Sequence, residues 1–129
     1  MLYAIVAVFV LLAGLLLRQR WCLAARRAEQ ALLASTERGD IDQMQALLRR
    51  RANVNARNPQ GWTPLHIAVA GGDITLVDLL LRHGADVNAA SYVGATPFDH
   101  AVTYGQAREL VQLLRQHGAQ GHTDRDTIF

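Results

Sequence analysis

Five histidines and one cysteine are the side chains of this 129-residue chain most able to bind a metal or act in catalysis. His117, His122 and Asp124 lie close together in the sequence near the C-terminus and could form at most a weak surface metal site, which we do not expect to be used. No serine or cysteine has a recognisable base beside it, and no glycine-rich phosphate loop follows a strand. Because none of these residues forms a recognisable catalytic or cofactor-binding arrangement, we expect a protein that is not an enzyme. We also expect no metal, no cofactor and no small-molecule substrate.

The elements that would position these residues begin with an apolar segment, Leu2–Leu17. It has sixteen residues without a charge, eleven of them Leu, Ile, Val or Phe, whose transfer into lipid favours insertion by about 3–7 kcal/mol. As a helix it is about 24 Å long, and Arg18, Arg20 and Trp21 can lie at the interface of a bilayer core that is ~30 Å thick. We therefore expect residues 1–21 to be a transmembrane signal anchor and residues 22–27 a basic juxtamembrane linker.

A cleaved secretory signal is the alternative for this segment. Such a signal carries positive charge before the apolar run and a small-residue cleavage site after it, whereas here the arginines follow the run directly.

The positive-inside rule then predicts that the C-terminal part lies in the cytosol. The residues expected at the membrane interface are Arg18, Arg20, Trp21, Arg26 and Arg27. All thirteen basic residues are arginine, a bias typical of GC-rich bacterial genomes, so we expect a single-pass protein of a bacterial inner membrane.

The charge is distributed unevenly along the chain, although the formal net charge is only +2. Residues 18–57 carry nine arginines and four acidic residues, a net charge of +5, and residues 58–129 carry four arginines and seven acidic residues, a net charge of −3. The positive half lies next to the apolar segment, which indicates a membrane surface and not nucleic acid as its partner.

A motif recurs in the remainder of the chain. It begins Thr63-Pro64-Leu65-His66 and closes with Gly84–Asn88. A shift of 33 residues maps Thr63-Pro64 onto Thr96-Pro97, and it maps Ala85–Asn88 back onto Ala52–Asn55. This pattern resembles the ankyrin repeat, a pair of helices followed by a hairpin loop. The resemblance implies an all-α solenoid of three repeats after one N-terminal transmembrane helix. The expected domain is residues 28–121, divided at about 28–57, 58–90 and 91–121, with a polar tail at 122–129.

Within the central repeat, Thr63 and Pro64 are expected to begin a helix that ends at Gly71-Gly72, and a second apolar stripe includes Leu80. By the resemblance, His66 hydrogen-bonds the helix start to the loop and is not a ligand. A third close, His117-Gly118-Ala119, lies 34 residues after its counterpart. One extra residue is therefore expected between Gly105 and Leu110, in the turn between two helices.

The outer repeats depart from the motif in a direction typical of capping repeats. In the first, Gln30-Ala31 replaces Thr-Pro and Arg51 replaces Gly84. In the third, His100 replaces Ile67 at an apolar position, and we expect it on the uncovered outer face.

The resemblance also implies a protein partner, since this family binds through hairpin tips and the exposed side of the first helices. The partner-binding residues expected from it are Arg57, Pro59, Gln60, Trp62, Tyr92, Val93, Tyr104 and His83. Three of them, Trp62, Tyr92 and Tyr104, are aromatic residues of the type enriched in interface hot spots. The alternative for Trp62 is that it only covers its own hairpin.

The function expected from these features is that of a membrane-anchored adaptor or scaffold. An antitoxin-like or immunity-type inhibitor of one dedicated enzyme is the alternative, in the cytosol or in the periplasm. At the C-terminus, Thr127-Ile128-Phe129 fits the pattern that adds to a sheet edge in PDZ-type domains, and a frayed terminus is the simpler interpretation.

Overall fold

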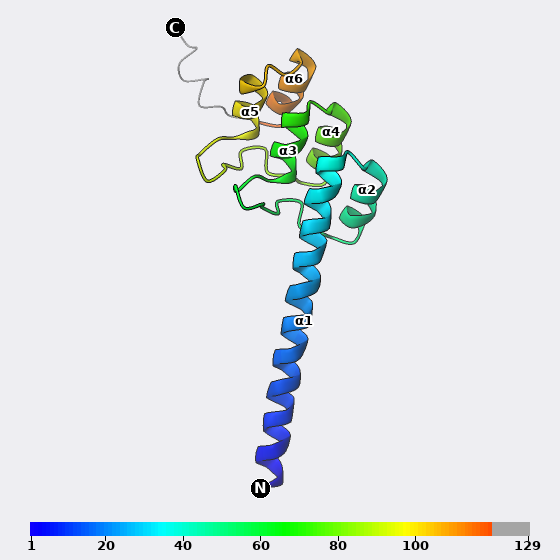
Figure 1. Ribbon diagram of the computed structural model, residues 1–129, viewed down its shortest axis with the longest axis vertical. Helices are drawn as coiled ribbons and strands as arrows, with labels where there is room; N and C mark the ends of the chain where they lie inside the picture. The colour runs from blue at the N-terminus through cyan, green and yellow to red at the C-terminus, as the bar shows by residue number, and fades with distance from the viewer. Residues whose placement is uncertain (120–129) are drawn as a thin grey trace.

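The computed structural model describes residues 1–119, and this part of the chain contains six helices and no strand. Their bounds are α1 Leu2–Arg38, α2 Ile41–Arg49, α3 Pro64–Gly71, α4 Ile74–Arg82, α5 Pro97–Thr103 and α6 Arg108–Gln116. The C-terminal part of α1 packs against α3, and α3 packs against α5, while α2, α4 and α6 each cover their partner in a second layer (Figure 1). The all-α repeat architecture predicted from the sequence is confirmed.

The core lies between the two layers. Leu32, Leu65 and Phe98 come from the first layer, and Leu80 and Leu114 come from the second. All five are buried, so each repeat completes its apolar surface only against its neighbours.

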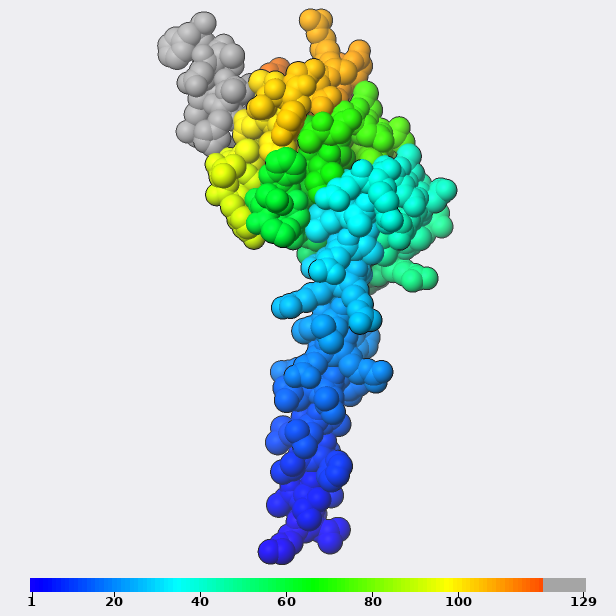
Figure 2. All heavy atoms as spheres, in the orientation of Figure 1, coloured from blue at the N-terminus to red at the C-terminus, as the bar shows by residue number. Residues whose placement is uncertain are grey.

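Helix α1 is continuous from the apolar segment into the first repeat. Its 37 residues correspond to a length of about 55 Å, and every residue from Met1 to Arg27 is exposed. This N-terminal half stands clear of the repeats (Figure 2). It is long and apolar enough to cross a membrane. Residues 22–27, predicted as a linker, are helical like the residues on either side.

The local sequence explains this continuity. The helices α3 and α5 begin at Thr63-Pro64 and Thr96-Pro97, where threonine caps the helix and proline takes its first position. The first repeat has Gln30-Ala31 at the same place, which lacks both start signals. No helix-starting residue interrupts α1 at this position, so the apolar segment and the first helix of the repeat form one continuous helix.

The turns between paired helices follow from single residues. Asp40 and Asp73 cap α2 and α4, their Oδ1 atoms accepting hydrogen bonds from Gln43 N at 3.1 Å and Leu76 N at 3.2 Å. At the third turn the extra residue predicted from the spacing shifts the N-cap of α6 to Ala107, which makes no side-chain cap. Gln106 instead ties this turn to the preceding one, because its Nε2 donates to Ala70 O at 2.9 Å.

Candidate partner-binding surface

Two hairpin loops project from the repeats, and the first of them spans Asn58–Trp62. Asn58 N donates to Trp62 O at 3.0 Å, and Gly61 N donates to Asn58 O at 2.8 Å. The Asn58 side chain also organises the loop, since its Oδ1 accepts from Gln60 N at 3.0 Å and from Trp62 N at 2.9 Å. Pro59 and Gln60 are exposed at the tip.

The second hairpin, Ser91–Ala95, repeats this construction. Ser91 N donates to Ala95 O at 2.8 Å, and Gly94 N donates to Ser91 O at 2.9 Å. Its tip carries Tyr92 and Val93, with 72% and 87% of their surfaces exposed. Two apolar side chains so exposed on an ordered turn form an accessible contact point.

The two hairpins are fixed to each other. Arg57 Nη1 donates to Gly61 O at 2.9 Å and to Ala90 O at 2.6 Å, so one guanidinium connects both loops. Tyr92 lies against Gly61, where a β-carbon would come within 2.7 Å of the Tyr92 ring. Gly61 also has φ +79°, a conformation that favours glycine. The hairpins therefore present one surface.

His66 anchors the second hairpin to α3. Its Nδ1 accepts from Thr63 N at 3.1 Å and lies 2.8 Å from Thr63 Oγ1, and its Nε2 lies 2.9 Å from Ala95 O. Because Nδ1 accepts from an amide, the ring is the neutral tautomer with its proton on Nε2, which donates to Ala95 O. The predicted structural role of His66 is confirmed.

A cluster of four rings lies beside the hairpins and comprises Trp62, His66, His100 and Tyr104. The ring centroids of Trp62, His66 and Tyr104 are 4.6, 5.0 and 5.8 Å from the centroid of His100, all edge-on. The prediction that His100 lies on an uncovered face is wrong, since its side chain is buried. The neighbouring rings bury the imidazole of His100.

Burial lowers the pKa of both histidines in the cluster. For His66, a hydrogen bond to the Ala95 backbone opposes this effect, and the nearby positive charge of Arg57 adds to it. For His100, a hydrogen bond to the backbone of His66 and the Asp99 carboxylate oppose it. The Nδ1 atom of His100 is buried without a hydrogen-bond partner among the described residues, which agrees with a neutral ring.

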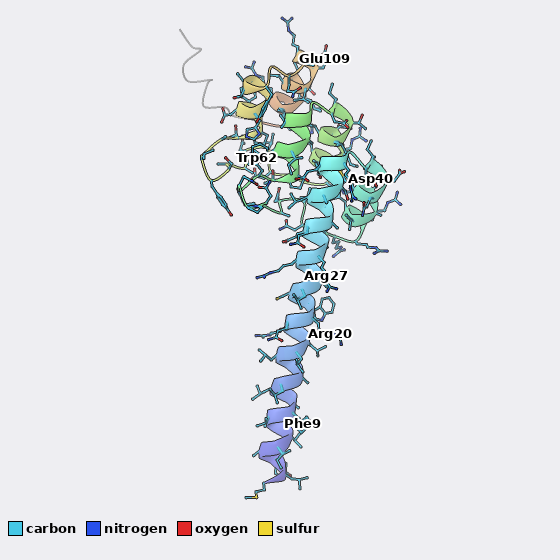
Figure 3. The ribbon with its side chains drawn as sticks, in the orientation of Figure 1. Phe9, Arg20, Arg27, Asp40, Trp62 and Glu109 are labelled. Carbon is cyan, nitrogen blue, oxygen red and sulfur yellow. The ribbon has the colours of Figure 1, made fainter. Side chains whose placement is uncertain are left out.

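The structure brings most of the predicted partner-binding residues together. Pro59, Gln60, Tyr92 and Val93 are exposed at the two tips, and Tyr104, with 52% of its surface exposed, borders the ring cluster. Their role in binding stays a prediction. Trp62 is the last residue of the first hairpin (Figure 3), but its side chain is half-buried against His100.

His83 is placed differently from these residues. It is the C-cap of α4, in the second helix layer, and its side chain is exposed. The predicted membrane-interface residues Arg18, Arg20, Trp21, Arg26 and Arg27 are all exposed along α1.

The turn residues Asn58, Gly61, Ser91 and Gly94 are not among the predicted partner-binding residues, although the sequence contains a signal for them. Asn58-Pro59-Gln60-Gly61 has asparagine, proline and glycine at the positions that a type I turn favours. Ser91 and Gly94 repeat its first and last positions 33 residues later.

No group of three metal-binding side chains occurs within residues 1–119. His122 and Asp124, with the tail at 122–129 and its Thr127-Ile128-Phe129 end, lie outside the described residues.

Comparison with known proteins identifies the repeats. A search of curated proteins finds no match to the chain. The family model for ankyrin repeats, in three copies, matches residues 31–125. Ankyrin repeats are generally modules of protein–protein interaction and are typically non-catalytic. With the helix pairs, the hairpin loops and this match over most of its length, the chain belongs to the ankyrin-repeat family.

Proposed function

We propose that this protein is a membrane-anchored adaptor that binds another protein through its second and third repeats. The observation that carries the proposal is the exposed apolar tip of Tyr92 and Val93 on loops joined by the Arg57 hydrogen bonds. A loop held in this way loses little conformational freedom when a partner binds, which favours affinity. Aromatic side chains at such positions contribute strongly to interfaces.

The proposed anchor is the apolar half of α1, which crosses the inner membrane of a bacterial cell. The arginines that follow Leu17 are exposed, and the positive-inside rule assigns them and the repeats to the cytosol. A reporter enzyme that is active only in the periplasm, fused after Phe129, should be inactive. Strong reporter activity would show that the repeats face the periplasm.

The binding site is tested by crosslinking the full chain in its own membrane and recovering the partner. The variant Tyr92→Ala/Val93→Ala should lower the affinity for the partner about thirtyfold, the factor that corresponds to a hot-spot loss of about 2 kcal/mol, and the partner should then no longer be recovered. Arg108→Ala, at the exposed start of α6, is the control and should bind as the wild type does. An unchanged partner yield in the double variant would contradict the proposed site.

If the recovered partner is an enzyme, an adaptor leaves its activity intact, whereas an inhibitor abolishes it.

A further inference from the structure

A hollow lies between the exposed part of α1 and the loop that follows α2. Its volume is about 360 Å³, and its walls include Trp21, Ala28 and Glu29 of α1 and Arg50 and Arg51 of the loop. Two more small residues, Ala24 and Ala25, also line it on the α1 side. Asn53 Nδ2 donates to Glu29 Oε1 at 3.2 Å, and this hydrogen bond holds the loop against the helix.

Arg50 and Arg51 line the hollow, and three further arginines lie near it in the sequence, two on α1 and one at the end of α2. We call Arg26, Arg27, Arg49, Arg50 and Arg51 the basic surface, and all five side chains are exposed. No ion pair joins any of them to another of residues 1–119. Glu29 is the acidic residue of the wall, and its carboxylate already accepts from Asn53. The five arginines outnumber this single carboxylate, so the surface keeps an excess of positive charge within the described part of the protein.

The basic surface lies close to the end of the apolar segment. At 1.5 Å per residue, Trp21 lies about 6 Å and Glu29 about 18 Å beyond Leu17 along α1. Figure 3 shows the same order along the helix, with Phe9 in the apolar part and Arg20 and Arg27 between it and the repeats. The headgroup layer of a bilayer is about 5–8 Å thick on each side, and charges act over about 8 Å at physiological salt.

Two features hold the loop that follows α2 beside the Trp21–Glu29 part of α1. Helix α1 continues without a break through this interval, and the Asn53–Glu29 hydrogen bond joins the loop to it. The end of α2, with Arg49 as its last residue, is directed along α1 toward the N-terminal half (Figure 1). Arg50 and Arg51 are thus placed beside the interfacial part of the anchor.

We propose that the basic surface binds the anionic headgroups of phospholipids and so docks the first repeat on the bilayer. This inference rests on the proposed membrane anchor. Guanidinium groups bind phosphate oxygens through paired hydrogen bonds, which makes arginine well suited to this ligand. The continuity of the surface with the apolar anchor identifies a lipid as the source of the phosphate.

The test uses the full chain in nanodiscs of phosphatidylcholine, alone or mixed with phosphatidylglycerol. The measurement is the thermal unfolding midpoint of the repeats, followed by circular dichroism. A ligand that binds only the folded state raises this midpoint, and we expect a rise on the order of 5 °C with the anionic lipid at low salt. High salt should reduce the rise.

The variant Arg50→Gln/Arg51→Gln should lose more than half of this rise. The control, Arg82→Gln/Arg108→Gln, removes the same charge from exposed positions in the second and third repeats and should keep the rise. Each variant is compared with itself in the two lipids, so a change in its intrinsic stability cancels.

The outcomes separate docking from anchoring. A wild-type protein that enters both discs with equal midpoints overturns the docking and leaves the anchor intact, whereas one that enters neither disc overturns the anchor. Equal losses in the two double variants would show a general attraction of charge and overturn the site. Glycerophosphate in solution that gives the same rise in phosphatidylcholine discs would overturn the assignment to lipid.

Discussion

Arg51 offers the sharpest test of how the repeats are stabilised, because it has the wrong backbone conformation for its residue type. Its φ is +59°, and it is the one non-glycine residue with positive φ among residues 1–119. The equivalent positions in the other repeats, Gly84 and Gly118, have φ values of 84° and 87°. All three residues follow the end of a second helix, where the left-handed conformation is common.

The replacement Arg51→Gly should stabilise the protein. A left-handed residue with a β-carbon costs about 1–2 kcal/mol, and glycine in the unfolded chain gives back about 0.4–1 kcal/mol through its greater freedom. The net gain is about 0.5–1 kcal/mol, which raises the thermal midpoint of a domain of this size by about 2–8 °C. The assay is thermal unfolding of the full chain in phosphatidylcholine discs, where the charge of Arg51 has no anionic lipid to bind.

Two further variants make this reasoning refutable. Arg51→Ala removes the charge but keeps the β-carbon, so it should give no comparable gain. Gly84→Ala should lower the midpoint by a similar amount, since a β-carbon there meets no atom within 4 Å and only the backbone is strained. An equal gain in Arg51→Ala would assign the effect to repulsion between neighbouring arginines and refute the backbone argument.

Three other predictions concern the core and the ring cluster. Leu80→Asp should unfold the repeats, measured as lost helicity, because it places a charge in a fully buried position, whereas Ile74→Asp at an exposed position of α4 should not. The free energy of unfolding should fall as the pH drops below about 6.5, the pKa of a histidine in the unfolded chain. The fall should end below the lowered pKa values that His66 and His100 have in the folded protein. Between these limits the unfolded chain binds more protons than the folded protein does. The free energy of unfolding is measured by urea titration at several pH values. The variant His100→Phe should show a smaller change of this free energy with pH, and the same change as in the wild type would contradict the prediction. Trp62→Ala should destabilise the repeats by about 1–3 kcal/mol in the same titration, while Tyr92→Ala should cost much less.

The parts of the fold that depend on local sequence could be predicted. The repeat period located the helices, and the one-residue change in spacing placed an insertion between Gly105 and Leu110, where Gln106 reaches back to Ala70. The hairpin tips are expected from the family resemblance, and their turn residues carry a local signal as well. These features arise from a few neighbouring residues, so the sequence is sufficient to locate them.

Features that depend on contacts between repeats could not be predicted in the same way. Arg57 fits an exposed loop position in the sequence, yet its guanidinium contacts Ala90, 33 residues away. The replacement of Thr-Pro by Gln30-Ala31 predicts, from the sequence, only a polar change in a capping repeat. Its larger effect is that α1 continues through this point, which depends on the preceding residues also being helical.

His100 shows how such a contact changes the interpretation of a site. An imidazole in place of Ile67 suggests an uncovered face, but Trp62 from the preceding loop and Tyr104 from the end of α5 pack around it. The edge-on contacts suit a neutral ring, and the same cover lowers the pKa of His100, which keeps the ring neutral near pH 7. Trp62 therefore contributes to the packing of the third repeat and has less surface free for a partner. For this reason Tyr92 and Val93, which are mostly exposed, are the residues whose loss separates binding from folding.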